Sequence, residues 1–432
     1  MKIGIIGGGM MGLSLAQYLT SDNHEVVVYE KSSQLGGLAT HHDFGGFEWD
    51  RYYHVILPTD GPLINFIKLL GLGDKLAWET TKTGFYVKGK FYPLNDTIDF
   101  IKFPPLNLWN KFRLGLTILY ASRIKNWKAL EKIPVEDWLI KYSGTQTYNK
   151  LWKPLLLAKL GENYKRVSAV FIWSYISRLY GARDSSARKE QMGYLSGGYK
   201  TVFDKLLSNI KKGNGEIFRN CTVKSVLQGS DNKLKIETDD GVNEFDKVIF
   251  TSPTDVLQKV VSSELVDVKH AGGEVEYSGV VCLVLVTKKE VSPYYTLNIT
   301  DNTVPYTAVI GMSSIVPLEE TGGYYLTYFP KYIHSDDPFL RKTDDEISDL
   351  FLTGIKKMYP QITEEDIVSV HVNREFKVQP LQVLNYSKII PDVSTQHPNF
   401  YILNSSQFVN NTLNNNAVIQ AVNDFIQQRN IE

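Results

Sequence analysis

The sequence predicts an α/β fold in which a parallel sheet, covered by helices, is interrupted by an inserted mixed α+β region. Three observations predict it. An apolar run at 2–6 is followed by a cluster of glycines and then by helical spacing of apolar residues at 13–19. A second apolar run follows at 25–30, and comparable runs return at 247–253 and 398–403. We therefore expect the chain to leave the parallel sheet twice and to return to it each time.

The composition is that of a folded chain with more than one domain. Its 432 residues exceed the usual size of a single core. Hydrophobic residues make up 43% and charged residues 22%, as in ordinary globular proteins. Lys plus Arg and Asp plus Glu both number 47, so the chain lacks the positive field that favours nucleic acid. We expect a small-molecule or lipid-like partner instead.

Cysteine usage and the lengths of the apolar runs bear on the compartment. Cys221 and Cys282 are too few for a disulfide framework and lack metal-ligand spacing, which predicts a reducing compartment and no metal. The glycine cluster begins a few residues after Met1 and leaves no room for a cleavable leader, so we expect cytoplasmic localisation. The longest apolar runs, such as 280–286, are far shorter than the roughly 20 residues of a spanning helix.

The glycine cluster has the spacing of a phosphate-binding turn between a strand and a helix. Gly7 allows the tight turn, Gly9 lets backbone amides approach a diphosphate, and Gly12 lets the helix pack closely on the strand. Met10 and Met11 lie between these glycines, where the amino terminus of the helix faces an anion. The turn therefore predicts a dinucleotide site.

A carboxylate ends the second predicted strand. Glu30 lies 18 residues beyond Gly12, where it can accept hydrogen bonds from both ribose hydroxyls. It would repel a 2′-phosphate, which argues against NADP, although the neighbouring Lys31 weakens that inference. We therefore expect Glu30 and Lys31 to flank the adenosine end of the dinucleotide.

A second glycine pair follows in the segment Leu35-Gly36-Gly37-Leu38-Ala39-Thr40. With the first cluster and Glu30, this pattern resembles the flavoprotein group that contains protoporphyrinogen oxidase, carotenoid desaturases, monoamine oxidase and UDP-galactopyranose mutase. The resemblance implies FAD and a Rossmann-like FAD-binding domain of the glutathione reductase type. It places Gly36 and Gly37, with Leu38, Ala39 and Thr40, along the diphosphate and ribityl chain. The match departs at Leu38, where many members have Arg, so the contacts there are expected from the backbone.

An extended stretch at 47–56 is expected to enter the cofactor cleft, because its apolar and polar residues alternate. Members of the group often have a histidine here, and this chain keeps Asp50 and His54 but has Tyr52 where glycine is usual. The resemblance makes His54 a candidate catalytic residue. The alternative is a half-buried histidine bonded to a carbonyl, and the sequence does not decide between the two.

The resemblance also divides the chain into domains. The FAD-binding domain is expected from 1–75, 191–262 and 385–432, and the substrate domain from 76–190, as helices, and 263–384, as a sheet. Helical spacing at 135–142 and 170–180 supports the helical part. The strands expected in the second FAD-binding part are 221–226, 234–238 and 247–253. In relatives this part lines the adenine, which makes Val223 a candidate contact.

The carboxyl-terminal segment fits the same pattern. A strand is expected at 398–403 and a helix at 416–425, whose amino terminus covers the flavin pyrimidine in relatives. Relatives end the strand in Gly-Asp or Gly-Glu, whereas this chain has Asn404-Ser405-Ser406. We expect flavin contacts from five residues, Asn404, Asn414, Asn415, Asn416 and Ala417. The alternative is that these asparagines only form turns.

The predicted function is that of an FAD-dependent oxidoreductase, with hydride transfer to or from flavin N5. No second dinucleotide fingerprint occurs. Amine oxidation is disfavoured, because relatives present a lysine from the strand that matches 279–285, and none is present here. One alternative is a sugar-nucleotide mutase without net redox, in which Arg374 holds a diphosphate beside His54. Another is a flavoprotein that only binds a partner.

The segment 100–120 combines apolar bulk, Trp109 and basic residues. Lys and Arg can keep their charges among lipid headgroups while Trp109 and its Leu and Phe neighbours enter the interface. This predicts peripheral contact with the inner face of a membrane. The same residues can instead form the core of the helical part and a lid over the cleft, which is the interpretation that we favour from sequence. The oligomeric state is not predicted.

Overall fold

A five-stranded parallel sheet forms the base of the fold. The computed structural model describes residues 1–181, 191–267 and 272–428. The strand order is β19-β13-β1-β2-β9. The strands are β1 (Lys2–Ile6), β2 (Glu25–Tyr29), β9 (Gly215–Phe218), β13 (Lys247–Phe250) and β19 (Phe400–Ile402). All four neighbouring pairs are parallel, so their carboxyl ends meet at one edge of the sheet.

Helices cover one face of this sheet and a small second sheet covers the other. The helices are α1 (Met10–Ser21), α2 (Gly61–Leu69), α9 (Lys200–Lys212) and α12 (Asn415–Gln428). Helix α1 packs against α9 and α12. The opposite face packs on the antiparallel strands β10 (Ser225–Gln228), β11 (Leu234–Thr238) and β12 (Gly241–Phe245), with α10 (Thr254–Val260) beside them. Gly4 allows this approach, since a Cβ there would lie 2.7 Å from Ile236.

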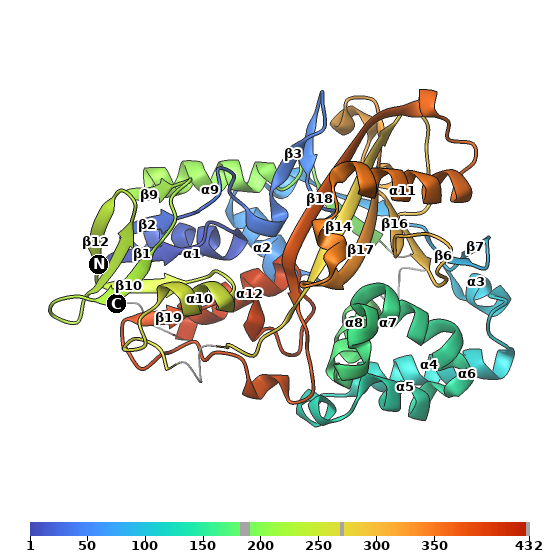
Figure 1. Ribbon diagram of the computed structural model, residues 1–432, viewed down its shortest axis with the longest axis horizontal. Helices are drawn as coiled ribbons and strands as arrows, with labels where there is room; N and C mark the ends of the chain where they lie inside the picture. Colours follow the sequence, from blue (N-terminus) through green and yellow to red (C-terminus); the bar gives the residue numbers. More distant parts are fainter. Residues whose placement is uncertain (182–190, 268–271, 429–432) are drawn as a thin grey trace.

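A seven-stranded sheet forms the second part of the molecule (Figure 1), in the order β18-β14-β17-β16-β15-β6-β7. Its strands are β6 (Thr83–Val87), β7 (Lys90–Pro93), β14 (Tyr277–Thr287), β15 (Thr296–Ile299), β16 (Ala308–Gly311), β17 (Tyr325–His334) and β18 (Ile367–Pro380). Every pairing is antiparallel except that of β15 with β6. This sheet supplies one wall of the site described below.

The longest fully buried strand of this sheet, β14, lies between β18 and β17 and is buried along its whole length. Alternate residues point to opposite faces of a strand. Val281 and Leu283 pack in the core under α11 (Asp344–Met358). Cys282 and Val284 pack on the other face, in a core that includes Trp49. The two faces of the sheet therefore have different surroundings.

A layer of helices lies below the seven-stranded sheet in Figure 1. It consists of α3 (Thr97–Lys102), α4 (Leu108–Arg123), α5 (Val135–Ser143), α6 (Thr145–Thr147), α7 (Lys153–Leu160) and α8 (Ala169–Gly181). These helices share a core of their own, in which Trp138 and Tyr148 are almost fully buried. Helix α7 packs directly against β17. No helix in the described part of the chain is long and apolar enough to cross a bilayer.

The predicted α/β class is confirmed, with two local corrections. Residues 76–93 are strands rather than the start of a helical part, because β5 (Leu76–Thr80) pairs with β8 (Gln191–Leu195) and β6 and β7 complete the seven-stranded sheet. The strand expected at 221–226 begins only at Ser225, since the Cys221 amide donates to the carbonyl of Glu30 instead. With these changes, we propose that the domain boundaries are those that the sequence predicts.

Candidate active site

The turn between β1 and α1 places its three glycines in different environments. Gly7 has a φ of +116°, which favours glycine. A Cβ on Gly12 would lie 2.0 Å from the carbonyl oxygen of Gly7, so close packing of helix and strand requires glycine there. A Cβ on Gly9 would have only one heavy atom within 4 Å, the Cα of Gly37, at 3.9 Å. The space beside Gly9 is therefore left open by the protein.

Helix α1 begins directly after this open space. Its first turn contains no acidic side chain, and no side chain caps its amino terminus. Met10 and Met11 are buried in the core, so they present backbone rather than side chain to the turn. Backbone N–H groups and the helix dipole at such a terminus favour a phosphate group.

The second glycine pair lies against the first turn. The Gly36 amide donates to the carbonyl of Gly8 (2.9 Å), and Gly9 and Gly36 form a parallel bridge. Gly36 and Gly37 both have positive φ, at +105° and +58°. Leu38 is half-buried and Ala39 is buried. The hydroxyl of Thr40 is buried and has no hydrogen-bond partner among the residues that the structure describes, so it is available to a bound group. These two loops fit the diphosphate and ribityl chain of FAD.

Glu30 follows β2 and lies beside the same loops. Its carboxylate accepts hydrogen bonds from the amides of Gly8 (2.7 Å) and Ser32 (2.8 Å). Lys31 is exposed next to it. Val223 lies in the same buried core as Cys221, in the segment between β9 and β10, and we propose that its backbone meets the adenine. The two amide hydrogen bonds therefore hold the Glu30 carboxylate in place before any ribose binds.

His54 lies against a buried carboxylate and an aromatic ring. Its Nδ1 is 3.6 Å from Oδ2 of Asp50, and it is buried without a hydrogen bond. Asp50 is only 2% exposed, and its Oδ1 accepts from the amide of Tyr199 (2.8 Å). The imidazole packs edge-on against the ring of Tyr199, with ring centres 5.2 Å apart. The imidazole thus has a carboxylate at ion-pair distance.

Arg374, which the sequence pairs with His54, lies elsewhere. It pairs in register with Val281, on the sheet face that α11 covers. Its guanidinium forms an ion pair with Asp344, the first residue of that helix. Asp50, the partner of His54, lies by the opposite face of the sheet. Its backbone carbonyl accepts a hydrogen bond from the hydroxyl of Tyr328, which packs on that face.

A cluster of aromatic and amine groups that the sequence did not single out lies between α7, α8 and the seven-stranded sheet. The hydroxyls of Tyr53 and Tyr332 are 2.5 Å apart. The Nζ of Lys159, on α7, lies 4.5 Å from the centre of the Tyr332 ring. Burial lowers the pKa of Lys159 to about 8 and raises the pKa of Tyr175, on α8, to about 12. Richness in tyrosine was the only signal of this cluster in the sequence.

The carboxyl-terminal asparagines have separate roles. Asn404 accepts from the Ser406 amide in its own turn and donates to the carbonyl of Ser252 (2.9 Å). Asn414 accepts from the amide of Ala417 (2.9 Å) at the start of α12. Asn416 accepts from an amide of α2 (3.1 Å). The side-chain nitrogen of Asn415 is buried, with the Tyr199 hydroxyl as its neighbour, and makes no hydrogen bond of ordinary length among the described residues. We propose that, of these side chains, Asn415 bonds the flavin and the others shape the turn.

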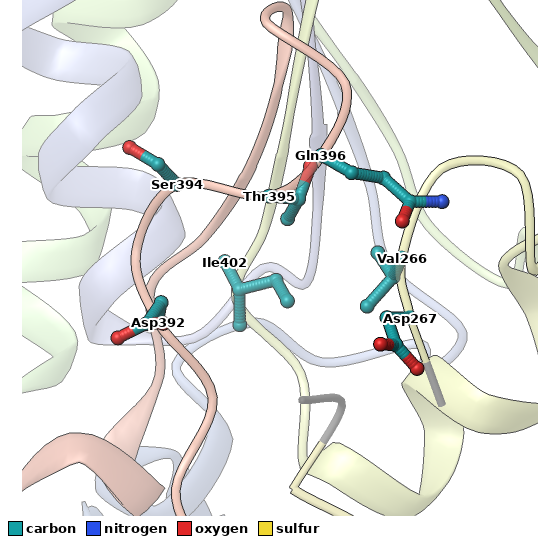
Figure 2. Close-up of a pocket in the computed structure, with 7 residues that line it drawn as sticks. All are labelled: Val266, Asp267, Asp392, Ser394, Thr395, Gln396 and Ile402. Atoms are coloured by element: carbon teal, nitrogen blue, oxygen red, sulfur yellow. The ribbon is translucent and has the colours of Figure 1, made fainter. Parts of the chain in front are cut away.

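Two pockets of about 280 Å³ each occur in the described part of the chain. One lies between α8, the residues before α2 and the loop before α12; its lining includes Asp60, Ser174, Arg178 and Asn416. The Arg178 Nη2 is 3.1 Å from Oδ2 of Asp60 there. The other, shown in Figure 2, is lined by Val266, Asp267, Asp392, Ser394, Thr395, Gln396 and Ile402. It lies at the edge strand β19, which β13 separates from β1, and none of its lining residues belongs to the glycine loops.

The fold and the two glycine loops define an FAD-binding oxidoreductase. A sequence model of the family described as "Flavin containing amine oxidoreductase" matches residues 10–405, and the chain belongs to this family. The resemblance predicted from the sequence is thereby confirmed, as are FAD as the cofactor and the enzyme class.

Several curated proteins are similar to this chain. The 15-cis-phytoene desaturase of Synechococcus elongatus is 22% identical over 253 residues, which cover 54% of this chain and 52% of the desaturase. Mitochondrial protoporphyrinogen oxidase of Nicotiana tabacum is 22% identical over 295 residues, which cover 58% of each chain. The chain spans about half the length of the phytoene desaturases that it matches.

Solved structures share the fold over the whole chain. An oxidoreductase from Methanosarcina mazei has a TM-score of 0.76 at 19% identity, and covers 99% of this chain and 100% of its own. Putrescine oxidase bound to putrescine has a TM-score of 0.75 at 14% identity and full coverage of both chains. Reduced UDP-galactopyranose mutase has a TM-score of 0.74 at 16% identity, with coverage of 100% and 96%. At such identities the likeness shows the fold alone.

Proposed function

We propose that the chain catalyses hydride transfer between a small or lipid-like substrate and flavin N5, with the substrate on the tyrosine-rich side of the seven-stranded sheet. The observation that carries the proposal is the placement of His54 and the Tyr53–Tyr332 pair. His54 and Tyr53 are adjacent in sequence. His54 lies beside Asp50, and Tyr53 bonds Tyr332 on β17 of that sheet. Bound FAD supplies a hydride acceptor or donor.

The residues of this site support distinct roles. The His54 imidazole, beside the Asp50 carboxylate, can hold or move a proton at one of its nitrogens. The Tyr53–Tyr332 pair offers apolar rings with a polar edge to a substrate, and such rings suit lipid-like molecules. Lys159 adds an amine close to the rings. These roles are compatible with a largely apolar substrate that carries an oxygen or nitrogen function.

The non-redox alternative loses its main support. A sugar-nucleotide mutase needs a cation beside the flavin to hold a diphosphate, and Arg374 is bonded to Asp344 on the other sheet face. The similarity to the mutase structure shows a shared fold and does not by itself support mutase activity. We therefore favour redox turnover over isomerisation.

A flavin-bleaching screen tests the proposal. The purified protein would be mixed without oxygen with apolar, sugar-nucleotide and amine compounds, and the absorbance of oxidised flavin followed. We expect an apolar compound to bleach the flavin and oxygen to restore it. Conversion of a sugar nucleotide only by pre-reduced protein, without net redox, would overturn the proposal.

We further propose that the enzyme meets its substrate at a membrane surface through an exposed apolar stripe on α3 and α4. The stripe consists of Ile98, Ile101, Leu108, Trp109, Phe112, Leu116 and Tyr120, each 45% to 71% exposed. On α4 these residues recur at helical spacing, so they share one face. The core interpretation fits Leu106 and Leu114, which are buried, but not the stripe itself.

The charge around the stripe supports an anionic lipid surface as its partner. Residues 100–130 contain six Lys and Arg and no Asp or Glu. Lys102 and Arg123 are exposed near the two ends of the stripe. A basic rim around an apolar face is typical of peripheral contact with anionic lipid. A lipid-like substrate could then enter the protein without crossing water.

A further inference from the structure

Arg51 lies beside the glycine loops. It follows β4 (Glu48–Asp50), which forms a hairpin with β3 (His41–Asp43). Its backbone amide donates to the carbonyl of Thr40 (2.9 Å), and its guanidinium Nη2 donates to Oε1 of Gln34 (2.9 Å). Because the main chain contacts one end of the segment 34–40 and the guanidinium contacts the other, the side chain runs along the loop that carries the second glycine pair.

The guanidinium retains unused hydrogen-bonding capacity. Its Nε is buried and has no hydrogen-bond partner among the described residues. A buried cationic donor without a partner is unfavourable unless a ligand completes it. Glu375 is a nearby carboxylate, and its pKa is raised by burial, against the influence of Arg51 and Lys31. The ion pairs between described residues leave the Arg51 guanidinium without a carboxylate partner at contact distance.

The loops need a positive charge that their own residues do not supply. The diphosphate of FAD carries negative charge, and Glu30, the charged side chain hydrogen-bonded to the loops, is also negative. Lys31, next to Glu30, is exposed to solvent. The amino terminus of α1 contributes only a partial charge. Leu38, on the loop itself, contributes none. We propose that Arg51 is the cation that binds the FAD diphosphate, reaching it across the segment 34–40.

FAD release from the holoenzyme tests this assignment. Release after dilution would be followed by recovered FAD fluorescence, and the dissociation constant obtained from its concentration dependence. We expect Arg51→Gln to weaken FAD binding about 10- to 100-fold, the effect of losing one charge-assisted hydrogen bond. In the double variant Arg51→Gln/Leu38→Arg, a cation on the same loop should restore most of the affinity.

Two controls separate cofactor binding from support of the fold. Glu375→Gln removes the nearby carboxylate and should not weaken FAD binding; a loss equal to that of Arg51→Gln would show that Arg51 acts only by balancing Glu375. In the unmutated protein, FAD should protect Arg51 from modification by phenylglyoxal, as mapped by mass spectrometry. An Arg51→Gln dissociation constant within twofold of wild type, or equal modification with and without FAD, would overturn the proposal.

Discussion

At the scale of single residues, the glycines of the first turn separate cofactor binding from folding. Gly9→Val fills space that only Gly37 borders, so the chain should fold but retain little FAD. Gly12→Val drives a side chain into the Gly7 carbonyl and should destabilise the fold itself. Circular dichroism and flavin content of the two purified variants measure the difference. Full FAD occupancy in Gly9→Val would show that the diphosphate does not bind at this turn.

The His54 imidazole is expected to act in turnover rather than in cofactor binding. It lies beside Asp50 and Tyr199 but makes no hydrogen bond through Nδ1, so its loss should leave FAD content unchanged. If it transfers a proton, His54→Ala should lower the rate about 10²- to 10⁴-fold. His42→Ala, which removes a half-buried imidazole bonded to His371, serves as the control. Steady-state rates equal to wild type would leave His54 with a structural role.

Lys159 gives a pH dependence whose sign follows from its environment. Burial lowers its pKa in the folded chain to about 8 from an ordinary value of 10.5. Between these values the unfolded chain binds more protons, so raising the pH stabilises the fold. Relative to Lys159→Met, wild type should therefore gain thermal stability from about pH 8 to about pH 10.5.

Thermal midpoints at several pH values measure this effect. Lys153→Met, on the same helix, is the matched control and should run parallel to wild type. Parallel profiles for wild type and Lys159→Met would show that the amine is well solvated in the folded chain.

At the scale of elements, the parallel sheet was predicted correctly, including the return of the chain to it at β13 and β19, whereas part of the seven-stranded sheet was missed. The β1-α1-β2 unit is specified by apolar runs and glycines that are close in sequence, and the structure has it as expected. The strands β6 and β7 were missed, because they are completed by pairing with β15, which lies more than 200 residues away. Sequence periodicity does not carry such a pairing.

The same distinction applies to the site. The glycine loops are local patterns, so their residues could be named from the sequence. The hydroxyl pair of Tyr53 and Tyr332 joins residues that are 279 positions apart, and no pattern in either segment indicates that the two side chains meet. Arg374 was expected beside His54, and the structure pairs it with Asp344 instead. The face of the sheet that a β18 side chain occupies depends on the pairing of β18 with β14, which no local pattern reveals.

At the scale of the whole molecule, the apolar stripe on α3 and α4 makes a prediction about where the enzyme works. Trp109→Ser/Phe112→Ser removes two large side chains that are 65% and 57% exposed, so the fold should tolerate the change. Wild type should co-sediment with vesicles that contain anionic lipid, and the double variant should bind much less. Leu350→Ser is the control, because it replaces an exposed apolar side chain outside the stripe, on α11. It should bind vesicles like wild type.

Salt dependence identifies the forces in this contact. Screening weakens the attraction between the lipid and the basic residues of 100–130 other than the buried Lys111, but it leaves the apolar contribution of the stripe. Binding should therefore fall at moderate salt without vanishing. If the stripe instead covers a second copy of the chain, wild type would sediment as a dimer, the double variant as a monomer, and neither would bind vesicles. That outcome, or the absence of vesicle binding at low salt, would contradict membrane contact and favour a substrate that reaches the site through water.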